Sequence, residues 1–175
     1  MYTSGTTGKP KGVMLTHDNI LNGGKNVLLS HNLDKLDKAL CVLPLYHING
    51  FIVTVMGPLV SQSSVVLCEK FSATNFWHQI SEFKCTWFSI VPTIVSSLIN
   101  KYSESEFKLI NTNLVKFGRS ASAALAPETH KNFEKKFKIN LIETMGLTET
   151  CAPILSNPMD PIKIKYGSPG IAYGN

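Results

Sequence analysis

Ser64-Val-Val-Leu-Cys68 and Trp87-Phe-Ser-Ile-Val91 flank a helical pattern at 73–83, and this stretch decides the fold class. Short runs of β-branched and apolar residues predict buried strands. A second helical pattern follows at 93–101. Strands that alternate with helices in this way predict an α/β fold, with a mainly parallel sheet and helices on both of its faces.

The same alternation extends along the whole chain and indicates one domain. The first predicted helix has Thr16 as a candidate N-cap, with Asp18 in its opening turn. The last has Pro127 at its first position and Phe133 and Phe137 facing inward. Further strands are predicted near Val13–Leu15, Leu40–Leu43, Val115–Phe117 and Ile139–Ile142, and further helices at 17–30, 48–60 and 127–137.

Three unusual segments follow predicted strands: Pro44–Gly50, Gly118–Ala124 and Thr144–Thr150. In open α/β sheets, ligands bind beyond the carboxyl ends of the strands. We therefore expect these three segments to form a site at one edge of the sheet.

Composition excludes several classes of protein. A hydrophobic share of 43% and a charged share of 17% are typical of a globular chain. The net charge of the chain is +5. Apart from Arg119, its basic residues are scattered lysines, so no nucleic-acid partner is expected. The apolar stretch 48–60 is too short to span a bilayer, so no integral membrane segment is expected. Four widely spaced cysteines favour a reduced, cytoplasmic setting.

Residues 3–12 form a glycine-rich loop that combines three glycines, four hydroxyl side chains and two lysines. Glycine allows close backbone approach, successive N–H groups bind anions, and lysine adds positive charge for a polyphosphate. A flexible surface loop is the alternative. A Walker P-loop is excluded because Pro10 follows Gly8-Lys9, and we expect the loop to join strand to strand.

This loop and the following Val13-Met-Leu-Thr-His-Asp-Asn19 resemble the signature of the AMP-forming acyl-CoA synthetase, adenylation-domain and luciferase superfamily. The resemblance implies that the loop folds over the β- and γ-phosphates of ATP. The residues that it assigns to ATP here are Thr3, Ser4, Gly5, Thr6, Thr7, Gly8 and Lys11.

Thr144-Met-Gly-Leu-Thr-Glu-Thr150 is similar to the Tyr-Gly-x-Thr-Glu segment of the same superfamily. The resemblance implies that Thr148 contacts the α-phosphate and that Glu149 helps to hold Mg²⁺, a metal that prefers oxygen ligands. It also places Thr144, Met145 and Gly146 at the nucleotide, with Met145 where an adenine-stacking tyrosine is frequent. A helix N-cap at Thr148 is an alternative that is compatible with this role.

Two further segments carry the resemblance, and each has a structural alternative. Gly118–Leu125 resembles a Ser-Gly-Ala-Ala-Pro-Leu segment that lines the adenine and acyl pockets. Pro44–Gly50 resembles the Pro-x-(Phe/Tyr)-His-x-x-Gly segment of the CoA-ligase and luciferase branch, and implies that His47 lies near the substrate carboxylate. The first segment assigns Ala121, Ser122 and Ala123 to nucleotide binding, whereas no catalytic role is expected for Arg119.

Together these resemblances imply an acid–CoA ligase that uses ATP and Mg²⁺ to form an acyl-AMP and then transfers the acyl group to coenzyme A. Its partners would be a small-molecule carboxylic acid, ATP and CoA, and fatty acid metabolism is one expected setting. Residues 1–175 are expected to be a partial AMP-binding (adenylation) domain, a core subdomain without the small C-terminal domain and its catalytic lysine. A non-catalytic, degenerate nucleotide-binding fragment and an acyl-AMP ligase with a non-CoA acceptor stay open as alternatives.

Overall fold

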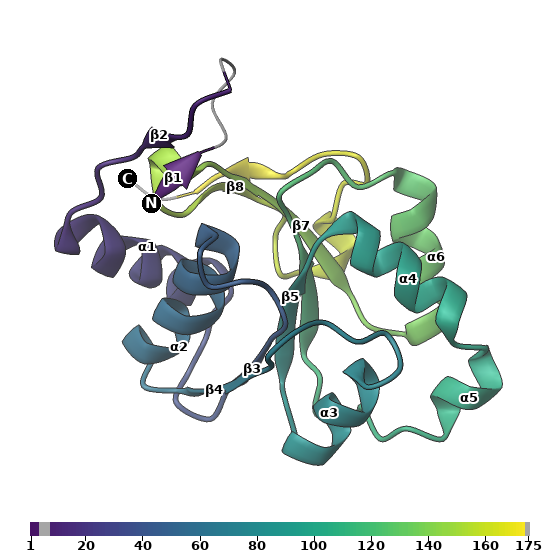
Figure 1. The fold of residues 1–175 in the computed structure, drawn as a ribbon. Coiled ribbons are helices and arrows are strands. Elements are labelled where there is room, and N and C mark those ends of the chain that lie inside the picture. The colour runs from purple at the N-terminus through teal and green to yellow at the C-terminus, as the bar shows by residue number, and fades with distance from the viewer. Residues whose placement is uncertain (4–7, 174–175) are drawn as a thin grey trace.

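The computed structural model describes residues 1–3 and 8–173, and its centre is a seven-stranded sheet in the order β4-β3-β5-β6-β7-β8-β9 (Figure 1). The first five strands in this order are parallel, and the last two pair antiparallel. The α/β class is therefore confirmed. The strands are β3 (Lys38–Cys41), β4 (Ser64–Leu67), β5 (Trp87–Ile90), β6 (Phe117–Ser120), β7 (Leu141–Gly146), β8 (Pro153–Ser156) and β9 (Ile171–Ala172).

Helices cover both faces of the sheet, as the strand–helix alternation predicted. Figure 1 shows α1 and α2 on one side and α4 and α6 on the other. The helices are α1 (His17–Ser30), α2 (Gly57–Val60), α3 (Phe76–Phe83), α4 (Pro92–Lys101), α5 (Glu104–Lys108) and α6 (Pro127–Phe137). The predicted helix 48–60 is divided into the π-helix η1 (Asn49–Met56) and α2. Within the described ranges, no helix is long and apolar enough to cross a membrane.

Each face of the sheet has its own hydrophobic core. Successive side chains of a strand point to opposite faces, and β5 shows this directly. Trp87 packs with Val27 of α1 and Phe117 of β6 in one core. Phe88 packs in the other core, which includes Phe133 and Phe137 of α6. The inward orientation predicted for these two phenylalanines is confirmed.

The start of α1 is as predicted. The Thr16 hydroxyl accepts a hydrogen bond from the Asn19 backbone N–H at 3.1 Å, and the Asn19 side chain accepts one from the Thr16 N–H at 3.0 Å. This reciprocal capping box satisfies two backbone donors that a helix leaves without partners.

Several predicted strand boundaries were wrong. Val13–Leu15 is not a strand: β1 (Tyr2–Thr3) pairs antiparallel with β2 (Lys11–Gly12), and Val13 adds only two hydrogen bonds to Met1. The loop nevertheless joins strand to strand, as predicted.

The strands β6 and β7 lie further along the chain than the predictions at Val115–Phe117 and Ile139–Ile142. As a result, residues 118–120 and 144–146 belong to strands and not to loops. Position 118 of β6 requires glycine, because a side chain there would collide with the Phe88 ring on the neighbouring strand. Arg119, Ser120 and Thr144 are polar but buried. Because buried strands were predicted from apolar runs, these residues were not assigned to strands.

Candidate active site

Two adjoining pockets lie at the carboxyl ends of the parallel strands, where three predicted loop segments were expected to meet. The small pocket has a volume of 340 Å³ and the large pocket one of 630 Å³. Ser122, Gly146 and Leu147 line both of them, so the two cavities meet at these residues. The expectation of one shared site is therefore matched by the geometry.

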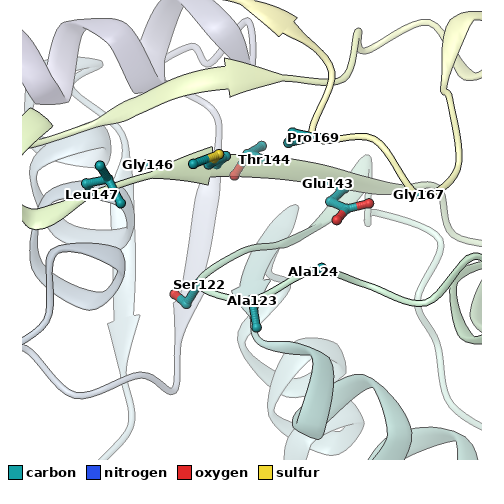
Figure 2. A pocket seen from close by; sticks show the side chains of 10 residues that line it. Ser122, Ala123, Ala124, Glu143, Thr144, Gly146, Leu147, Gly167 and Pro169 are labelled. Carbon is teal, nitrogen blue, oxygen red and sulfur yellow. The ribbon is translucent and has the colours of Figure 1, made fainter. Parts of the chain in front are cut away.

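The small pocket lies between the turn after β6 and strand β7. Figure 2 shows Ser122, Ala123 and Ala124 facing Glu143, Thr144 and Gly146 across the cavity, with Gly167 and Pro169 from the C-terminal segment closing one side. Met145 also lines it and is 42% exposed. The small side chains of Ser122, Ala123 and Ala124 on one wall allow a flat ring to lie close to the backbone.

Glu143 is a polar residue of the small pocket that the sequence analysis missed. The residue is only 4% exposed, and its Oε1 accepts a hydrogen bond from the Leu125 backbone N–H at 3.0 Å. Oε2 is buried without a hydrogen-bond partner among the residues that the structure describes, and so is the Thr144 hydroxyl. An acid directly after the apolar pair Leu141-Ile142 was the available signal. These two atoms can bind a ligand group in the pocket.

The large pocket carries Thr148 and Glu149 at the end of β7. Both lie on a short 3₁₀ helix, Thr148–Thr150, whose N-cap is Leu147. The Thr150 hydroxyl accepts a hydrogen bond from the Leu147 N–H at 2.9 Å, so the alternative that made Thr148 the N-cap is wrong. The hydroxyl of Thr148 is thereby left free of the capping role.

Glu149 is exposed and forms no ion pair within the described ranges. No group of three histidine, cysteine or acidic side chains gathers as a metal site in the same ranges. A single accessible carboxylate at the edge of the large pocket fits Mg²⁺, which is commonly held by one or two carboxylates together with substrate phosphates.

The close turn before η1 presents His47 to the large pocket. His47 is exposed, and its ring lies 4.6 Å from that of Tyr46. Gly50 allows the turn, because a side chain at this position would collide with the carbonyl oxygen of Pro44. His47 and Glu149 thus line the same cavity from two different strand ends.

The glycine-rich loop is described only in part. Thr3 lines the large pocket, Gly8 has a positive φ of 82°, and Lys11 is exposed on β2. The predicted contacts of Ser4, Gly5, Thr6 and Thr7 lie outside the described residues. Ala121 is buried, donates its N–H to the Ile90 carbonyl at 3.2 Å, and lines neither pocket.

Comparison with known proteins agrees with this geometry. The sequence profile of the family described as AMP-binding enzyme matches residues 1–175. The chain belongs to this family. The AMP-binding relatives include the sulfoacetate–CoA ligase of Cupriavidus necator, with 50% identity over 97% of this chain, and the oxalate–CoA ligase of Saccharomyces cerevisiae, with 37% identity over 99%.

A solved structure of the same fold is ATP-bound MatB from Rhodopseudomonas palustris. It has a TM-score of 0.86 and 28% identity, and the match covers 99% of this chain and 33% of that one. The chain also covers 32% of the sulfoacetate–CoA ligase and 31% of the oxalate–CoA ligase, so it spans about a third of the length of the curated relatives that it matches.

Behind the large pocket, this AMP-binding chain contains a buried polar network around Arg119. The guanidinium Nη1 donates to Asn49 Oδ1 at 2.6 Å and to Ser89 Oγ at 2.9 Å. Asn49 Nδ2 in turn donates to Ser122 Oγ at 3.2 Å. No catalytic role was expected for Arg119 from the sequence, and the network connects this residue to the pocket only through other side chains.

Proposed function

We propose that this chain supplies the nucleotide-binding and acid-binding surfaces of an ATP-dependent acid–CoA ligase. The observation that carries this proposal is the pair of adjoining pockets, which meet at Ser122, Gly146 and Leu147. A ligand with a flat ring in one cavity can extend a phosphate chain into the other. The acid would then lie beside the α-phosphate, where acyl-AMP must form. Transfer to CoA, and a small C-terminal domain with the catalytic lysine, belong to the complete ligase in this proposal.

Adenine is the ring that suits the small pocket. The free Oε2 of Glu143 can accept a hydrogen bond from the exocyclic amine of adenine, and Met145 can cover a ring face with its polarizable sulfur. Guanine has a carbonyl oxygen at the corresponding position, which the carboxylate would repel. The pocket therefore favours ATP over GTP.

The reaction would take place in the large pocket. An oxygen of the substrate carboxylate forms a bond to the α-phosphorus, and the bond from that phosphorus to pyrophosphate breaks. In this proposal the Thr148 hydroxyl would donate to an α-phosphate oxygen and the His47 ring would orient the acid. Both residues line the large pocket together with Thr3. Glu149 would hold Mg²⁺, which when bound neutralises phosphate charge. Lys11 and the loop residues Ser4 to Gly8 would bind the leaving phosphates.

The acid is proposed to be small and to carry a second acidic group. This class is suggested by the acids named for two relatives, sulfoacetate and oxalate. A fatty acid is the second candidate, because Leu43, Ile48 and Val91 give the large pocket an apolar wall.

A cytoplasmic setting is part of the proposal and is supported by the four cysteines, which are free thiols.

Exchange of labelled pyrophosphate into ATP tests the first half-reaction. In a complete ligase that contains these residues, Glu149→Ala should lower the acid-dependent exchange rate by about 100-fold or more, because phosphate charge loses its counter-ion. Glu82→Ala, which removes an exposed acid on α3, is the matched control and should exchange at the wild-type rate. Full exchange by the Glu149 variant would remove this residue from the proposed metal site.

A further inference from the structure

Arg119 presents a buried positive charge without a matching negative one. The residue is 2% exposed, and its two hydrogen-bond acceptors, Asn49 and Ser89, are both neutral. In the part of the chain that the structure describes, no carboxylate forms an ion pair with it, and its Nε has no acceptor. Burial lowers the pKa of the guanidinium to about 9. A buried cation of this kind is stabilised when an anion approaches.

The network determines which way the Asn49 amide faces. Oδ1 accepts two hydrogen bonds, from Arg119 Nη1 at 2.6 Å and from Ser89 Oγ at 2.8 Å. These bonds fix the carbonyl end of the amide toward the interior. The amide Nδ2 is consequently held on the side of Ser122, and both Asn49 and Ser122 line the large pocket. The pocket wall thus has an N–H donor that is polarised by a buried cation.

This wall lies in the same cavity as Thr148 and Glu149, but it is contributed by different strand ends. The turn after β7 supplies Thr148 and Glu149, whereas η1 after β3 supplies Asn49. A short acid with two acidic groups could direct one group to the phosphate side and the other to the Asn49 side. An acid with one acidic group would place no anion on the Asn49 side of the pocket.

On the basis of the proposed ligase function, we propose that Arg119 acts through Asn49 as a specificity-determining residue that selects acids with a second anionic group. Arg119 is a positioning residue in this scheme, because Asn49 is the group that faces the pocket. The interaction is electrostatic, and the burial of Arg119 reduces the screening of its charge by bulk water.

The test compares acids of equal chain length in a complete ligase that contains these residues. The ratios of kcat/KM for malonate over propionate and for succinate over butyrate are measured by pyrophosphate exchange. We expect at least one ratio to be well above one in the wild type and to fall by about tenfold in Arg119→Met, as expected when a polar site loses its matching group. Arg119→Lys, which keeps the charge, should retain most of the preference. Lys135→Met, which removes an exposed lysine on α6, should leave the ratios unchanged.

A purely structural role for Arg119 predicts a different result, since it would lower the rates for both acids of a pair and keep their ratio. An unchanged ratio in Arg119→Met, or a wild-type ratio of one or below for both pairs, would overturn the inference. Asn49→Ala provides the second variant if Arg119→Met does not fold, and it should show the same fall. Absence of exchange with every acid in the wild type would instead overturn the proposed ligase function.

Discussion

Glu143 and Arg119 are buried charged residues on neighbouring strands, and each belongs to a different part of the site. The Glu143 carboxylate uses one oxygen to hold the Leu125 N–H and leaves the other free in the small pocket. Arg119 instead uses its charge behind the large pocket, through Asn49. A buried polar atom without a partner is destabilising, which favours a ligand that supplies the partner.

The substitution Glu143→Gln tests the proposed role of Glu143 in adenine recognition. The glutamine can keep the hydrogen bond to Leu125, but it places an amide N–H₂ where the free oxygen was, and this donor would face the amine of the proposed adenine. We expect the KM for ATP to rise about tenfold, in keeping with a lost hydrogen bond to a charged group, and the preference for ATP over GTP to fall. Initial rates with both nucleotides measure this. Unchanged selectivity would exclude Glu143 from adenine recognition.

At the scale of elements, α1 connects the glycine-rich loop to the remainder of the site. Its Gly23 packs against the end of the Thr148–Thr150 turn, since a side chain there would meet the Cys151 carbonyl oxygen at 2.8 Å. The cap at Thr16 fixes where this helix begins. The position of α1 and the position of the Thr148–Thr150 turn therefore depend on each other.

Replacing the cap tests how much the start of α1 contributes. Thr16→Ala removes the hydroxyl that accepts from Asn19, and should lower the free energy of unfolding by about 1 kcal/mol. Urea denaturation of the purified protein measures the change. Asn22→Ala, at an exposed interior position of the same helix, should be neutral or slightly stabilising because alanine is the better helix former. Equal effects of the two substitutions would contradict the capping role.

On the scale of the whole molecule, the sheet separates the two cores, and the core beneath α1 contains a buried histidine. The His31 ring stacks on Phe117 at 5.3 Å, and Nδ1 lies 2.6 Å from the Ser30 hydroxyl. Burial, and next the positive charge of Arg119, lower the pKa of His31 to about 3. The folded protein therefore holds this imidazole neutral across the pH range in which an unfolded chain takes up the proton.

This difference predicts acid sensitivity with a definite sign. The contribution of neutral His31 is complete above pH 6.5 and is lost progressively as the pH falls from 6.5 toward 3. Between pH 7.5 and 5.5, His31 should account for a decrease of about 1.4 kcal/mol in the free energy of unfolding. His31→Phe keeps an aromatic ring but cannot take up a proton, so its decrease over the same range should be smaller by that amount. Parallel pH slopes for the two proteins would show that His31 is not the responsible group.

The α/β class, the bounds of α1 and α6, and the convergence of three segments at one edge of the sheet could all be predicted from the amino-acid sequence. These features depend on local periodicity, on capping residues and on the geometry common to parallel sheets. The motifs containing His47, Thr148 and Glu149 could also be recognised, because each is a short contiguous pattern.

The extent of β6 and β7 and the polar partners of the site depend instead on contacts between distant segments. Gly118, Arg119 and Ser120 have little preference for strands of their own, so the strand at 117–120 depends on neighbours such as Phe88 and not on the local sequence. Asn49, Ser89 and Arg119 are 30 to 70 residues apart in the chain, and strand pairing brings them together. A hydrogen-bond network between distant segments produces no periodic pattern in the sequence. The buried charge behind the large pocket could therefore be identified only from the three-dimensional structure.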